Sequence, residues 1–166
     1  MSGFLCRCCG KIHNEMPMHY GAAAPALWFT FPESERDLRC ELSSDQCIID
    51  GEHFFVVGNL EIAVAGLEER FSWDVWVSIS KANFERTCDL WEVEGRESEP
   101  PYFGWLSTDL PGYPDTLSLK TMVHTRALGH RPRVELEPTE HPLAIEQLQG
   151  ITRARVQAIA EMVLHG

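Results

Sequence analysis

The chain contains no long apolar run. None of its stretches approaches the roughly 18 apolar residues that a helix needs to cross a bilayer. Its opening residues, from Met1 to Arg7, lack the apolar core and the cleavage pattern of an export signal. We therefore expect a cytoplasmic protein that makes no membrane contact.

The sequence also lacks the short motifs that identify common enzyme classes. It has no G-x-S-x-G elbow for a nucleophilic serine, no P-loop for phosphate and no glycine-rich dinucleotide fingerprint. Internal repeats and low-complexity segments are missing as well. These absences favour a function without catalysis.

Positive charge is scarce. The chain has 14 Lys and Arg against 25 Asp and Glu, which gives a formal net charge of −11. Nucleic-acid binding depends largely on cations that displace phosphate counterions, so we do not expect a nucleic-acid partner. The same acidity would suit a basic protein partner, as in an immunity-type protein that neutralises its target by charge complementarity.

Length and composition fit one domain. The chain has 166 residues, of which 44% are apolar and 23% charged, close to the average for globular proteins. We divide it into a Cys- and His-rich N-terminal segment (1–30), a sheet region (45–137) and a C-terminal helical region (140–165). All three are expected to share one domain, 1–166.

Strict alternation of apolar and polar residues predicts a strand over residues 71–79. Its apolar face would carry Phe71, Trp73, Val75, Val77 and Ile79. The opposite face, with Asp74 and Trp76, would be solvated, as in an antiparallel sheet that is covered on one side. Shorter alternations predict strands at 53–57, 59–64, 117–124 and 133–137, and Gly58-Asn59 reads as a turn between the first two.

Helices are predicted at 32–42, at 81–92 and in the C-terminal region. Pro142 suits a first helical position, Gly150 a C-terminal stop, and Thr152 the cap of a last helix. The fold class that follows is α+β: an antiparallel sheet with helices packed on one face and a zinc-knuckle-like turn at the N-terminus.

Cys6, Cys9 and Gly10 form the C-x-x-C-G pattern of a zinc knuckle. Two thiolates at this spacing can reach one ion, because the turn aims both sulfurs at a common point. His13 follows at a spacing that could supply an imidazole. For the fourth ligand of a structural Zn²⁺ we favour Cys47, with His19 and Cys40 as further candidates.

Three other interpretations of the cysteine cluster stay open. It can be an incidental run of thiols, since Cys8 and Cys9 are adjacent, or a degenerate knuckle that has lost its ion. It can also be a redox C-x-x-C pair, although such a pair normally opens a helix after a strand.

Two surfaces are candidates for contacts or chemistry. Trp76 on the polar strand face could mark a contact surface, or a helix could cover it. Tyr102 and Trp105, with Tyr113 in the loop 111–114, could form an aromatic-walled groove for a peptide or small ligand. As weak catalytic candidates, His124 and Asp74 would meet on one sheet face if their strands are neighbours. The simpler interpretation of those charged residues is ordinary cross-strand pairing.

Six strings of residues, taken together, resemble a bacterial family known only as a domain of unknown function, DUF2199. They are CRCCGKIH at 6–13, DQCIIDG at 45–51, WDVWVS at 73–78, PYFGWL at 101–106, LPGYP at 110–114 and VELEPTEHP at 134–142. The resemblance spans nearly the whole chain and implies a bacterial protein of this size. It implies no activity, substrate or cofactor.

The leading hypothesis is a non-enzymatic binding or regulatory module that carries a structural zinc knuckle. The alternative is a hydrolase-like enzyme that uses an open zinc position, or His124 with Asp74. A third possibility is the acidic, partner-neutralising protein described above.

Overall fold

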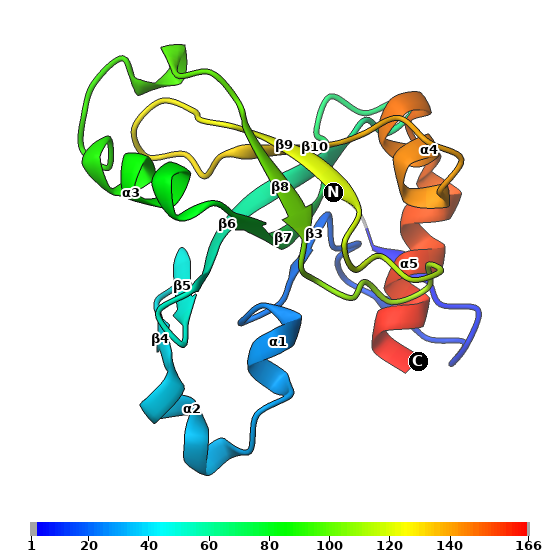
Figure 1. Ribbon diagram of the computed structural model, residues 1–166. Coiled ribbons are helices and arrows are strands. Elements are labelled where there is room, and N and C mark those ends of the chain that lie inside the picture. The colour runs from blue at the N-terminus through cyan, green and yellow to red at the C-terminus, as the bar shows by residue number, and fades with distance from the viewer. Residues whose placement is uncertain (1–2, 166) are drawn as a thin grey trace.

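Five strands close into a small barrel. In the computed structural model, which describes residues 3–165, these strands are β6 (His53–Ile62), β7 (Phe71–Ile79), β8 (Tyr102–Leu106), β9 (Lys120–His124) and β10 (Arg133–Leu136). Successive strands pair antiparallel, and β10 closes the barrel by pairing parallel with β6. Figure 1 shows these strands at the centre of the molecule.

Three short strands extend the sheet beyond the barrel. β3 (His19–Gly21) pairs parallel with β7, β5 (Gln46–Ile49) pairs antiparallel with β6, and β4 (Cys40–Leu42) pairs with β5. A separate two-stranded hairpin at the N-terminus consists of β1 (Phe4–Leu5) and β2 (Ile12–His13).

The helices surround the barrel on several sides (Figure 1). They are α1 (Ala26–Phe29), α2 (Glu33–Arg39), α3 (Lys81–Asp89), the 3₁₀ helix η1 (Arg96–Ser98), α4 (Pro142–Gln149) and α5 (Arg153–His165). Pro142 opens α4, and the Thr152 hydroxyl accepts a hydrogen bond from the Arg155 amide at the start of α5, as predicted. None of the helices in the described residues combines the length and apolar character of a membrane span.

The predicted fold class is wrong. The structure is mostly sheet, with a closed barrel, and its helices are not gathered on one face of an open antiparallel sheet. Phe84 of α3, Leu143 of α4 and Ile159 of α5 join the main core, whereas Leu27 of α1 packs on a second cluster across the sheet. Both faces of the central strands are therefore covered.

The predicted turn at Gly58-Asn59 lies inside the long strand β6. Gly58 is where β10 approaches β6, and a Cβ at this position would lie 2.8 Å from the Pro132 carbonyl oxygen. The glycine therefore allows the barrel to close rather than the chain to turn. By contrast, the strand predicted at 71–79 is confirmed as β7.

Candidate metal centre

The N-terminal hairpin shapes the cysteine turn. The Cys6 amide donates to the Lys11 carbonyl and the Gly10 amide donates to the Cys6 carbonyl, both at 2.9 Å. Gly10 has a φ of 71°, a left-handed conformation that glycine adopts without strain. β2 then pairs with β1 and places His13 opposite Phe4, on the strand that returns past the turn.

Helix α5 supplies a fourth donor, His165, from its last turn. Gln157, Glu161 and His165 are spaced four residues apart and so share one face of the helix. Gln157 Nε2 donates to the Leu5 carbonyl at 2.9 Å, and Glu161 accepts hydrogen bonds from Arg7. The N-terminal turn is therefore hydrogen-bonded to this face of α5.

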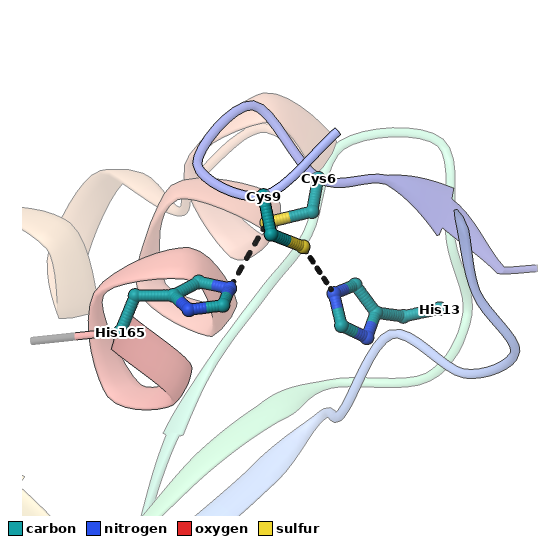
Figure 2. A group of neighbouring side chains, drawn as sticks. All are labelled: Cys6, Cys9, His13 and His165. Carbon is teal, nitrogen blue, oxygen red and sulfur yellow. Dashed lines mark hydrogen bonds between the residues drawn. The ribbon is translucent and has the colours of Figure 1, made fainter. Parts of the chain in front are cut away.

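Four donors converge where the turn meets the helix. Cys6 Sγ lies 3.3 Å from His165 Nε2, and Cys9 Sγ lies 3.5 Å from His13 Nε2. One sulfur or nitrogen atom from each of the four side chains lies within 4.8 Å of the other three. Figure 2 shows all four side chains pointing into the same space. The group could hold a metal ion.

Burial divides the group into an inner and an outer part. Cys6 is buried, His13 is intermediate, and Cys9 and His165 are exposed. Burial opposes ionisation of Cys6, but backbone amides of Cys9 and Cys8 aimed at its sulfur outweigh this, so its pKa lies below the ordinary value. A thiolate, the form that binds metals, is thereby favoured at the inner position.

A buried carboxylate anchors the turn. Glu161 is 5% exposed and accepts from the Arg7 amide at 2.5 Å and from Arg7 Nη2 at 2.7 Å. These hydrogen bonds lower the pKa of Glu161 to about 2. Because Arg7 follows Cys6 directly, this ion pair positions the inner side chain of the group.

Sequence reasoning missed His165, and the predicted fourth ligand lies elsewhere. Cys47 is fully buried in β5 beside Ile49 and Trp76, where burial raises its pKa to about 12. It is not a member of the converging group, and neither is Cys40, which pairs with Ile49 across β4 and β5. Apolar surroundings explain why Cys47 belongs to the core.

The two weak catalytic candidates do not meet. His124 Nε2 lies 3.1 Å from Glu135 Oε1 on the neighbouring strand β10. Asp74 is buried and instead contacts His19 Nε2 at 2.5 Å. His124 therefore pairs with Glu135 and not with Asp74, whereas Asp74 pairs with His19.

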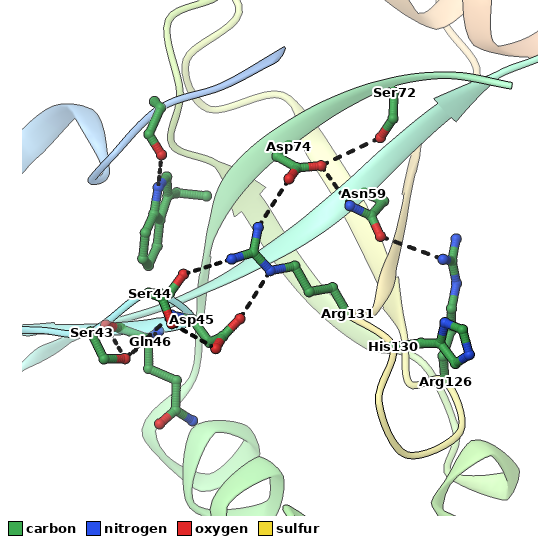
Figure 3. A network of polar contacts seen from close by, with 12 residues as sticks. Ser43, Ser44, Asp45, Gln46, Asn59, Ser72, Asp74, Arg126, His130 and Arg131 are labelled. Carbon is green, nitrogen blue, oxygen red and sulfur yellow. Dashed lines mark hydrogen bonds and ion pairs between the residues drawn. The ribbon is translucent and has the colours of Figure 1, made fainter. Parts of the chain in front are cut away.

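Asp74 belongs to a network that compensates its buried charge. Arg131 Nη1 donates to Asp74 at 2.9 Å, and Asn59 Nδ2 donates to its other oxygen at 2.5 Å. Arg131 Nε also donates to Asp45 at 2.9 Å, so that one guanidinium joins two carboxylates (Figure 3). These contacts pair the charge of the buried Asp74 carboxylate and provide hydrogen-bond donors to both of its oxygens.

The predicted aromatic surface is not continuous. Trp76 is 1% exposed, because the segment around α1 covers it and the Ala22 carbonyl accepts from its indole N–H at 2.9 Å. Tyr102 is buried, whereas Trp105 is 43% exposed on the opposite face of β8. Tyr113 is half-buried and donates to Glu146. The expectation of an exposed Trp76 was wrong.

Fold and site together define a small β-barrel protein with a Cys2His2 group at the junction of its N-terminal hairpin and last helix. Residues 5–151 match the family described as "Uncharacterized protein conserved in bacteria (DUF2199)". The chain belongs to this family, as the six strings of residues suggested. His165 lies beyond the matched residues. No curated protein and no solved structure matches the chain.

Proposed function

We propose that this chain is a non-enzymatic binding module whose N-terminal turn and last helix are joined by a structural zinc ion. Cys6, Cys9, His13 and His165 are the ligands in this proposal. The observation that carries it is the convergence of four soft or imidazole donors from two distant parts of the chain.

The donor spacing supports zinc. With Zn–S bonds of about 2.3 Å and Zn–N bonds of about 2.0–2.1 Å, a tetrahedral site separates sulfur from nitrogen by roughly 3.6 Å. The two S···N distances of 3.3 and 3.5 Å are close to this value. Two thiolates and two imidazoles also bind zinc in preference to hard cations such as magnesium or calcium, which prefer oxygen ligands.

The completeness of the donor set supports a structural role. A catalytic zinc usually has three protein ligands and keeps its fourth position for water or substrate, whereas structural sites are filled by four protein ligands. Cys6 and His165 are 159 residues apart in sequence, so one ion would fasten two ends of the described chain. Its binding energy would then contribute directly to folding.

A cavity on another side of the barrel supports the binding role. It has a volume of about 460 Å³ and lies between α3, β6 and the loop that joins β9 to β10. Small-molecule sites usually have volumes of roughly 300–1,000 Å³. None of the four metal donors lines this cavity, so the zinc site and the binding site are separate in our proposal.

Metal analysis of the full chain, purified without a histidine tag, tests the zinc site. We expect one equivalent of zinc per chain, and its loss in Cys6→Ser and His165→Gln. Cys8→Ser is the matched control, since Cys8 is an exposed cysteine of the same turn that is outside the group. Cobalt substitution should give the intense visible bands of a tetrahedral thiolate site.

The opposite results would reject the proposed site. They are zinc-free protein after purification in zinc-containing buffer, or equal zinc content in Cys6→Ser, Cys8→Ser and the unaltered chain. An octahedral cobalt spectrum would likewise contradict a four-ligand site.

A further inference from the structure

Three arginines line the cavity beside α3 in a strongly acidic chain. Arg96, Arg126 and Arg131 line it, and Asp45 is its only carboxylate among the described residues. The whole chain carries a formal charge of −11, so three arginines around one cavity run against the overall composition. Arg126 and Arg131 are paired with carboxylates, so Arg96, which forms no such pair within residues 3–165, is the cationic group that favours an anionic ligand.

Arg96 holds the loop between β9 and β10 through backbone carbonyls. Its Nε donates to the Arg126 carbonyl at 2.8 Å, and its Nη2 donates to the His130 and Ala127 carbonyls at 3.1 and 3.3 Å. Its Nη1 donates to the Trp91 carbonyl at 3.0 Å and keeps a second N–H that could reach a ligand oxyanion. Within residues 3–165 its guanidinium makes no ion pair with a carboxylate. Its positive charge is therefore not neutralised by the contacts that fix it.

The other two arginines are each fixed by a carboxylate that does not line the cavity. Arg126 Nη2 contacts Glu61 at 2.9 Å, and Arg131 is fixed between Asp45 and Asp74 (Figure 3). Glu61 and Asp74 do not line the cavity. A guanidinium has more N–H donors than these contacts use, so each can also face a ligand oxyanion in a fixed plane.

The remaining wall is apolar and includes one large ring. Trp91 is 47% exposed and lines the cavity together with Leu90, Val123 and Pro132. An exposed indole beside a fixed cationic group suits a ligand with a flat apolar body and a charged end.

We propose that this cavity binds a small organic anion, with its oxyanion group at Arg96 and Arg126 and its apolar ring against Trp91. The inference rests on the proposed function as a binding module and names its ligand class. It does not depend on the zinc ion, because no metal donor lines the cavity.

Fluorescence titration with 8-anilinonaphthalene-1-sulfonate, an aromatic anion, tests the cavity in the full chain. Trp91→Ala and Arg126→Gln should each weaken binding by about tenfold or more, since each removes a main contact. Trp105→Ala and Arg133→Gln are the matched controls. They alter a similarly exposed tryptophan and a neighbouring arginine outside the cavity, and should leave the affinity unchanged.

A neutral analogue, N-phenyl-1-naphthylamine, tests the contribution of charge. It should bind more weakly than the sulfonate and should not respond to Arg126→Gln. The ligand class is rejected if the unaltered chain does not bind the sulfonate, if both probes bind equally, or if the control variants lose as much affinity as the cavity variants.

Zinc content measured on the same samples separates this inference from the proposed metal site. Sulfonate binding that fails in zinc-loaded protein rejects the cavity proposal alone. Sulfonate binding that persists in folded, zinc-free Cys6→Ser supports the cavity proposal and shows that the two sites are independent.

Discussion

The barrel and the N-terminal turn differ sharply in how much apolar surface holds them. The main core contains Trp73, Phe71, Leu60 and many further buried side chains drawn from the barrel strands and helices. Among the described residues, the cluster beneath the N-terminal turn has three buried members, Phe4, Cys6 and Ala160, with Met16 packed against them. Burial of apolar surface can hold the barrel, whereas the turn depends on polar anchors and, in our proposal, a metal ion.

A metal ion should therefore affect the N-terminal turn more than the barrel. An ion that completes the Cys2His2 group would order the turn and the end of α5, and the barrel would keep its own core without it. The effects of mutations in the two regions should therefore separate: core changes reduce global stability, and changes near the turn reduce metal affinity.

The largest expected effect on stability comes from Trp73→Ala in the barrel. Trp73 is 1% exposed and packs edge-on against Phe71 with ring centroids 5.1 Å apart. Removing a buried aromatic ring of this size costs about 3–5 kcal/mol, which urea unfolding measures. Trp105→Ala on the barrel exterior should cost within about 0.5 kcal/mol, and equal losses in both variants would contradict the assignment of the core.

Glu161→Gln tests the polar anchor of the turn. The amide keeps the shape of the carboxylate but loses the charge that Arg7 contacts at 2.7 Å. Outer-shell changes of this kind weaken metal binding by about 10- to 100-fold, which competition with a chelating dye measures. Glu92→Gln, at an exposed glutamate away from the turn, is the control. Unchanged zinc affinity in Glu161→Gln would show that the anchor does not position Cys6.

A smaller effect is expected at alkaline pH from Tyr113, which joins the barrel to α4. Burial and the hydrogen bond to Glu146 raise the pKa of Tyr113 to about 12, above the value of about 10 for an unfolded chain. The neutral phenol therefore stabilises the folded state fully below about pH 10, and this stabilisation is lost as the pH rises toward 12.

Urea unfolding of the unaltered chain and of Tyr113→Phe across that range measures the effect. The unaltered chain should lose stability more steeply than the variant as the pH rises. Parallel curves would contradict the assigned role of the phenol.

Local patterns in the sequence predicted several strands and helices, but they did not predict that the strands close into a barrel. Alternation located β7, and the capping residues Pro142 and Thr152 located the last two helices. The barrel depends on the parallel pairing of Arg133 with Asn59, which brings together strands far apart in the chain. Alternation describes which side of a strand is apolar, and it contains no information on which distant strand will pair with it.

The same limit explains the incomplete prediction of the Cys2His2 group. Cys6, Cys9 and His13 are neighbours in sequence, so their spacing alone suggested that they converge. His165 reaches them only because α5 packs against the hairpin, with Glu161 four residues before it on the same helix face. Trp76 was misassigned for a related reason, since the covering residue Ala22 belongs to a distant segment.

Hydrogen exchange of the full chain, with and without a zinc chelator, tests the central claim most directly. We expect chelation to remove protection from the amides of Cys6, Arg7 and Gly10, which are hydrogen-bonded in the turn, and to leave the amides of β6 and β7 protected. Unchanged exchange at the three turn amides in protein that has lost its zinc would contradict a structural metal at this site.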